Sequence, residues 1–424
     1  MIENFFSLTE SESSSTQQTL KHNLRMHIGD GSMYVFGLSF MAVQTIVPVL
    51  MHTIGAGSLA ISAVPVLWMF GASIPQAFLV HYSVPTEYSR TPMLRYGLLH
   101  RIFFFLIACF ILLATYVSDA TSVIVLLLLL LLTATFGSLG GLPWFHVYNK
   151  TMPVKLRGRM FGLRQFIGAV LGICGGYIVN RVLSVVAFPL NFSILFGVGF
   201  LVMMASYAFL RKIIEPPMML KVKQTESKIS FWNEAKYILR ANKNFRYYLF
   251  ADALGLMSLT VSAFYSIYAI EKFHLPSSYA GTFTAIVMFT NVFGNILFGW
   301  FADHYGNKIN IVVLVLSSAV ASLLALTADD IVLFGFVFVF MANTITLQGI
   351  SRLSLVAEMC NEQQRQTYVA LFNVLTAPTM FIGIIFGSLV PVLGYTTIFL
   401  FGVALALSSA VILLFQVKEP RSRF

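Results

Sequence analysis

Apolar residues in this chain come in long blocks separated by short polar segments. A block of about 20 residues forms a helix that can cross roughly 30 Å of hydrocarbon, at about 1.5 Å per residue. Six blocks lie near residues 31–52, 59–80, 98–117, 122–147, 160–180 and 189–210. Six more lie near residues 248–270, 279–300, 309–327, 331–351, 368–390 and 397–416. The pattern predicts an all-α integral membrane protein with twelve transmembrane helices in two six-helix bundles.

The polar segments divide the chain into five parts. We expect cytoplasmic tails at residues 1–30 and 417–424, bundles at 31–210 and 247–416, and a cytoplasmic linker at 211–246. Within this linker, apolar residues recur at helical spacing among charged ones between Ser230 and Asn244. That spacing predicts an amphipathic helix on the inner membrane surface.

Charge adds an orientation to this picture. Charged residues make up only 10 % of the chain, against about 25 % in a soluble domain. If the N-terminus is placed in the cytoplasm, only two of the 27 basic residues, Arg181 and Lys272, lie on the outer side. This asymmetry follows the positive-inside rule and predicts a multi-pass protein of the plasma (bacterial inner) membrane with both termini cytoplasmic. The net charge of +10 then reflects orientation and lipid contact, so no nucleic-acid partner is expected.

The two halves of the sequence resemble each other. Asp30 precedes the first block, as Asp252 stands near the start of the seventh. The nine residues from Arg157 align without a gap with the nine from Arg365, and an arginine, a small residue, a leucine and an amide recur in register. Because transporters are commonly built from duplicated bundles, we interpret the match as an internal repeat.

A loop motif follows the eighth block. Gly299, Asp303, Gly306 and Lys308 have the spacing Gly-x-x-x-Asp-x-x-Gly-x-Lys. This pattern resembles the loop signature of the major facilitator superfamily, and residues 152–176 are similar to its loop between helices four and five in prokaryotic members. The resemblance implies a secondary active transporter that moves a small solute by alternating access.

Asp303 has two interpretations at the mouth of the predicted bundle. In one, its carboxylate pairs with an arginine or a helix N-terminus and latches one conformation. In the other, it only solvates a tight turn. The matching loop of the first half, at residues 81–85, has neither the acidic residue nor the glycine, so a symmetric latch is not expected.

The resemblance also implies where solute binds, because helices one, four, seven and ten line the cavity in family members. The matching neutral side chains, with one more from the eighth block, are Gln44, Ser258, Ser262, Tyr265, Asn291, Asn343 and Gln348. Hydrogen bonding between helices is the alternative role for Asn291. Few charges and 40 Phe residues favour a neutral, amphipathic or aromatic solute.

Asp252 and Asp30 are the candidates for ion coupling. Carboxylates inside a membrane are costly and therefore commonly functional. Asp252 lies about four residues inside its block and Asp30 nearer a boundary, so we expect Asp30 to be closer to solvent. We predict that a partly desolvated Asp252 takes up a proton during transport. The alternative is that both carboxylates only stabilise helix N-termini.

Other classes of protein fit less well. A facilitative uniporter and a multidrug or metabolite exporter stay open beside a proton-coupled transporter. A membrane enzyme needs paired carboxylates, a nucleophile with its base or clustered histidines, none of which is visible, and the repeat speaks against a channel. No cofactor or metal is predicted. The expected partners are a small solute, the lipid bilayer and protons, and we expect a monomer.

Overall fold

A computed structural model describes residues 14–82, 88–217 and 231–420, and these ranges contain helices and no strand. The first half comprises α2 (Ser14–Ser39), α3 (Ile46–Thr53), α4 (Ser58–Tyr82), α5 (Arg90–Leu113), η1 (Ala114–Tyr116), α6 (Asp119–Thr151), α7 (Val154–Val185) and α8 (Leu190–Leu210). The helix α9 (Phe231–Ala241) precedes the second half. This half comprises α10 (Lys243–Leu259), η2 (Thr260–Phe264), α11 (Tyr265–Lys272), α12 (Tyr279–Tyr305), α13 (Asn307–Thr327), α14 (Ile331–Glu358), η3 (Glu362–Gln364), α15 (Arg365–Thr376), η4 (Ala377–Phe381) and α16 (Ile382–Phe415).

These helices make twelve crossings, as the apolar blocks predict. Ten helical stretches of the described chain are long and apolar enough to span a membrane. One of them, residues 367–415, makes two crossings because α16 bends at Gly394, where φ is 73°. The first crossing consists of α2 and α3, and the non-helical residues 40–45 separate these two helices. The predicted fold class is confirmed.

Two predicted segments differ from the structure. Residues 14–30, expected in a tail, form the first part of α2, because this stretch packs on protein through Leu24 and Ile28. In the linker, the predicted amphipathic helix is α9. Its apolar residues Ala235 and Ile238 are buried against the second bundle, so this face contacts protein rather than the membrane surface. Linker residues 218–230 lie outside the described part.

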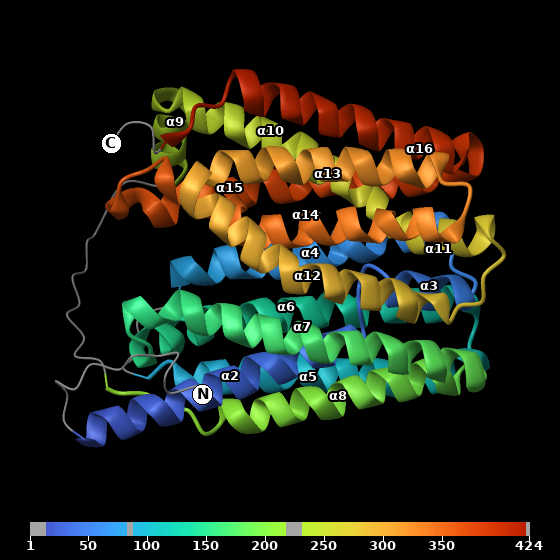
Figure 1. Ribbon diagram of the computed structural model, residues 1–424, viewed down its shortest axis with the longest axis horizontal. Helices are drawn as coiled ribbons and strands as arrows, with labels where there is room; N and C mark the ends of the chain where they lie inside the picture. The colour runs from blue at the N-terminus through green and yellow to red at the C-terminus, as the bar shows by residue number, and fades with distance from the viewer. Residues whose placement is uncertain (1–13, 83–87, 218–230, 421–424) are drawn as a thin grey trace.

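The two halves lie side by side, with α7 packed along α12 and α4 along α16 (Figure 1). Glycine makes the first contact close. A Cβ at Gly176 would lie 2.7 Å from the backbone oxygen of Gly281, and a Cβ at Gly281 would meet the backbone nitrogen of Asn180. Small residues allow such helix backbones to approach each other in membranes.

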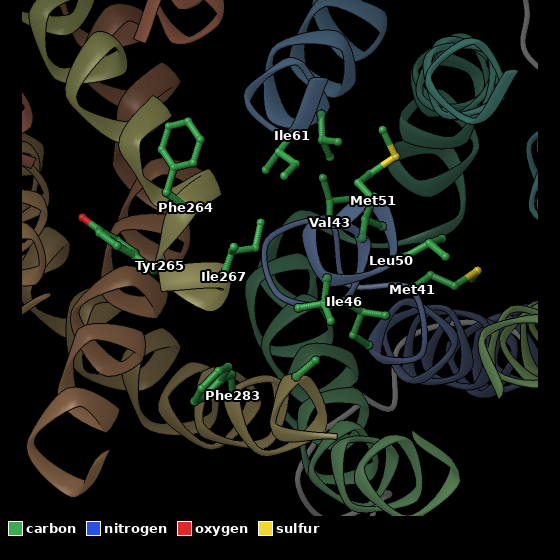
Figure 2. Packing of buried hydrophobic residues seen from close by; sticks show 14 of the residues in the cluster. Met41, Val43, Ile46, Leu50, Met51, Ile61, Phe264, Tyr265, Ile267 and Phe283 are labelled. Atoms are coloured by element: carbon green, nitrogen blue, oxygen red, sulfur yellow. The ribbon is translucent and has the colours of Figure 1, made fainter. Parts of the chain in front are cut away.

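Among the described residues, the two halves share an apolar cluster at one end of the molecule. We call the end with α9 and the C-terminus the terminal end, and the end with α3 and α11 the far end (Figure 1). At the far end one cluster includes residues of both halves, such as Ile46, Ile61, Phe264, Ile267 and Phe283 (Figure 2). At the terminal end the halves have separate clusters. The halves are therefore joined at the far end.

Candidate functional site

Three crossings are interrupted within the described chain. The first breaks at residues 40–45, the seventh at η2 and the eleventh at η4. At the first break, Thr45 Oγ1 lies 2.6 Å from Thr284 Oγ1, and Ser266 Oγ donates to the backbone oxygen of Gln44 at 3.4 Å. Both contacts join the two halves. Interrupted helices at the contact between repeats are typical of solute and ion sites in transporters.

The predicted solute residues fall into two groups. The side chains of Gln44, Asn343 and Gln348 are partly exposed and have no hydrogen-bond partner among the described residues. Their amides therefore keep unused hydrogen-bonding groups in this conformation.

The other candidates already have partners. Ser258 and Tyr265 are buried against α13, where their hydroxyls lie 2.8 Å from Ser318 Oγ and Ser322 Oγ. The Ser262 hydroxyl donates to the backbone oxygen of Leu259. Asn291 Oδ1 accepts from Thr346 at 2.9 Å, which is the predicted alternative of hydrogen bonding between helices. Three of these side chains connect helices of the second half in this conformation, whereas the hydrogen bond of Ser262 stays within its own crossing.

Asp252 forms an ion pair with Arg352, a partner that the sequence did not predict. Arg352 Nη2 lies 2.7 Å from Asp252 Oδ2, and Arg352 Nε donates to both carboxylate oxygens at 2.9 and 3.1 Å. Arg352 also donates to Thr376 Oγ1 at 2.8 Å and stacks on Phe372. Both charged side chains are buried, at 8 % and 7 % exposure. The pair joins the seventh, tenth and eleventh crossings.

Asp30 is as buried as Asp252, so the expectation that it lies closer to solvent is wrong. Its side chain is 5 % exposed, because α2 extends well beyond the apolar block on which the expectation rested. Asp30 Oδ1 accepts from Ser206 Oγ at 2.8 Å. Two arginines face it at 4.0 Å, Arg101 from α5 and Arg164 from α7.

The sequence did not reveal these arginine partners. Arg101, Arg164 and Arg352 stand near the ends of apolar blocks, where positive-inside charges are normal. All three are buried side chains. A signal was present for Arg352, because apolar residues continue after it to Val356.

The loop motif after α12 is held by a residue outside the motif. Gly306 adopts φ 86°, which favours glycine. Its missing side chain admits Glu419, whose Oε2 accepts from the backbone nitrogen of Lys308 at 3.1 Å. Asp303 is exposed and has no hydrogen bond or ion pair with described residues. The predicted latch of Asp303 is not formed in this conformation. That Asp303 latches a different conformation stays a prediction. The Cβ position of Gly299 has no neighbour within 4 Å.

The first half has the same arrangement. Glu215 accepts from the backbone nitrogens of Ser89 and Arg90 at 2.9 and 2.8 Å, and Lys150 pairs with it at 2.6 Å. Both glutamates precede a proline and follow the last crossing of their half. We call Glu215 and Glu419, with the helix N-termini they bind, the carboxylate clamps. Part of the arrangement at the terminal end is therefore symmetric, although the loop sequences are not.

A second pair of contacts repeats with the clamps. Asn23 exchanges two hydrogen bonds with the backbone of Ile214, both of 2.8 Å. Asn244 exchanges two with the backbone of Lys418, of 2.9 and 2.7 Å. Each asparagine lies on the first long helix of its half and binds the residue before the clamp glutamate. These contacts support the internal repeat.

The aligned arginines Arg157 and Arg365 are not equivalent in space. Arg157 donates to the backbone oxygens of Met152 and Asn149 at 2.9 and 2.8 Å, and so caps the end of α6. Arg365 is exposed and has no hydrogen bond to a described residue. Across the described ranges, no three His, Cys, Asp or Glu side chains are grouped as a metal site.

Replacing a clamp glutamate is expected to destabilise the protein. Glu215→Gln removes a buried charge that two backbone amides and Lys150 bind, at a cost of about 1.5 to 3 kcal/mol. Thermal unfolding of the purified protein measures the change. Asp303→Asn is the matched control and should leave the midpoint unchanged. Equal destabilisation by both variants would contradict the clamp.

The comparisons with known proteins agree with this architecture. The family model described as Major Facilitator Superfamily matches residues 31–351 and 253–424. A mutant of the nucleoside transporter NupG is 14 % identical, with a TM-score of 0.70 over 93 % of this chain and 100 % of that one. A partially occluded, inward-open structure of the xylose transporter XylE from E. coli is 15 % identical, with a TM-score of 0.66 over 94 % and 100 %.

A third solved structure is a bacterial homologue of the iron transporter ferroportin in an inward-facing state. It is 14 % identical, with a TM-score of 0.64 over 95 % of this chain and 99 % of that one. No curated protein sequence matches the chain. The protein belongs to the Major Facilitator Superfamily, and its function is secondary transport of a small solute.

Proposed function

We propose that the protein moves its solute by alternating access and that this structure is open toward the cytoplasm. The core distribution carries the proposal, because one apolar cluster joins the halves at the far end and separate clusters occupy the terminal end. The lysines and arginines gather toward the terminal end, which by the positive-inside rule supports a cytoplasmic position for that end and for both chain termini. Two similar solved structures are in inward-facing or inward-open states. We place the protein, as a monomer, in the bacterial inner membrane.

We further propose that Gln44, Asn343 and Gln348 contact the solute. They are the predicted residues whose side-chain amides have no described partner, and Gln44 lies at the break of the first crossing. An amide both donates and accepts hydrogen bonds, so these groups suit hydroxyl and carbonyl groups of a solute.

For coupling, we propose that protons act through the pairs at Asp252 and Asp30. A proton on a carboxylate oxygen of Asp252 removes its charge and releases Arg352 from the ion pair. That change loosens the contact of the seventh crossing with the tenth and eleventh. A uniporter, the alternative, keeps the same pair charged throughout its cycle.

A cross-link at the far end tests alternating access without knowledge of the solute. Asn180 of α7 donates to Thr282 Oγ1 of α12 at 3.2 Å, so cysteines at these positions should form a disulfide between the halves. The three native cysteines are replaced by serine and Gln44→Cys serves as reporter. With the halves linked, a membrane-impermeant maleimide should label residue 44 from the cytoplasmic side only. After reduction of the disulfide, residue 44 should be labelled from both sides, measured as the label in excess of that on the same variant with Gln44 retained.

The matched control links two helices of one half. Ser258→Cys and Ser318→Cys replace hydroxyls 2.8 Å apart, both within the second half. Their disulfide should leave labelling of residue 44 from both sides intact. Labelling from the outer side that persists with residues 180 and 282 linked would overturn the proposal.

A further inference from the structure

The first half contains a buried arginine that lacks hydrogen-bond partners. The Arg164 side chain is 8 % exposed, and its Nε and Nη1 atoms have no partner in the described chain. The nearest carboxylate oxygen, Asp30 Oδ2, lies 4.0 Å from Nη2, beyond hydrogen-bond distance. A buried charged group in this situation is costly.

The surrounding charges do not balance. Arg101 faces the same Asp30, and its three nitrogens already donate to the backbone oxygens of Met203 and Gly97 and to Ser206 Oγ. Ser206 in turn donates to Asp30. One carboxylate thus stands against two guanidinium groups. The second half differs, because its single buried arginine there, Arg352, is matched by Asp252.

The arginine packs against aromatic side chains. Its Cζ is 4.7 Å from the Trp144 ring centroid. A Cβ at Gly31 would meet the guanidinium directly, so the absence of a side chain there makes room for it. His27 packs beside the same tryptophan, with its ring 6.5 Å from Trp144 and 5.4 Å from Tyr148.

His27 adds an acceptor beside the same tryptophan, and we call Arg164, His27 and Trp144 the arginine cluster. The Thr151 hydroxyl donates to the backbone oxygen of Val147, so its oxygen accepts from His27 Nε2 at 2.8 Å. In this tautomer Nδ1 is left as an acceptor, and it is buried without a partner in the described chain. Two free guanidinium donors and one imidazole acceptor therefore border Trp144.

We propose that the arginine cluster binds the oxyanion of an anionic solute. A carboxylate or phosphate group accepts from Arg164 Nε and Nη1, which supplies the missing negative charge, and a hydroxyl of the solute donates to His27 Nδ1. The proposal deepens the proposed function and rests on it. It replaces the neutral solute that the scarcity of charges favoured.

The test measures binding in detergent, where transport is not required. The purified full-length protein is heated with inorganic phosphate, lactate or glycolate at constant ionic strength, with glucose as the neutral probe. At least one of the three oxyanions should raise the unfolding temperature, and glucose should not. Arg164→Gln should weaken that response roughly 10- to 150-fold in apparent affinity.

A control variant keeps the result interpretable. Arg164→Gln leaves Asp30 and Arg101 as a balanced pair, so the variant should fold. Arg159→Gln, an exposed arginine on the same helix, should respond as wild type. No response to any oxyanion, or an equal response in Arg164→Gln, would overturn the proposal. Stabilisation by phosphatidylglycerol micelles alone would do so too, because the oxyanion would then belong to lipid. None of these results bears on the cross-linking experiment.

Discussion

Asp252→Asn is expected to abolish solute accumulation and to lower the free energy of unfolding by about 3 to 5 kcal/mol, the usual cost of leaving one member of a buried ion pair unmatched. Arg352 is the group left behind. Its side chain is 8 % exposed and makes two short hydrogen bonds to the carboxylate, which a neutral amide cannot replace. Thermal unfolding of the purified protein gives the stability.

A double variant separates stability from coupling. Asp252→Asn with Arg352→Gln removes both charges, so most of the lost stability should return, since no charge is left unpaired. If protons act at this pair, the double variant should exchange solute without accumulating it in proteoliposomes with a pH gradient. Accumulation with the wild-type pH profile in the double variant would show that coupling lies elsewhere. A uniporter would show no pH-driven accumulation even as wild type.

Gly281→Ala is expected to open the far end. Its Cβ would meet backbone atoms of Asn180 and would lie 2.5 Å from the oxygen of Gly176, and backbone cannot yield as a side chain does. Overpacking of this kind costs about 1 to 3 kcal/mol. Because the contact joins α7 to α12, the cost falls on the conformation closed at the far end. Maleimide labelling of Gln44→Cys from the outer side should therefore increase about 5- to 100-fold.

Gly299→Ala is the matched control on the same helix. No atom lies within 4 Å of its Cβ position, and alanine is the better helix former by about 1 kcal/mol. Labelling of residue 44 should stay unchanged and stability should stay equal or rise. An equal increase in labelling for both variants would mean that helix propensity, not the contact between halves, controls the far end.

The sequence predicted the fold well because membrane crossings leave a strong one-dimensional signal. Hydropathy identified all twelve crossings. These include the last two, although α16 runs through both of them and bends between them at Gly394. It failed for residues 14–30, because a helix can continue into a polar stretch when it packs on protein. It placed α9 correctly along the chain, but could not show that Ile238 packs on the second bundle.

The site was less predictable for a related reason. A sequence shows how deep a charge lies along its helix, but not which neighbour it faces. Asp30 and Asp252 were identified as unusual, whereas their partners Arg164 and Arg352 read as ordinary charges at block ends. Likewise, a tyrosine such as Tyr265 suits the role of a solute ligand from the sequence alone. Only the packing shows that its hydroxyl is already hydrogen-bonded to Ser322.

The carboxylate clamps have a consequence for biosynthesis. Glu215 follows the sixth crossing, and all its partners, Ser89, Arg90 and Lys150, precede it in the chain. The first bundle therefore possesses every partner of its clamp as soon as residue 215 leaves the ribosome, before any helix of the second bundle exists. Glu419 and Lys308 repeat this order in the second bundle. Each bundle can thus complete its own assembly in the bilayer, and the pairing of α7 with α12 joins two units that are already built.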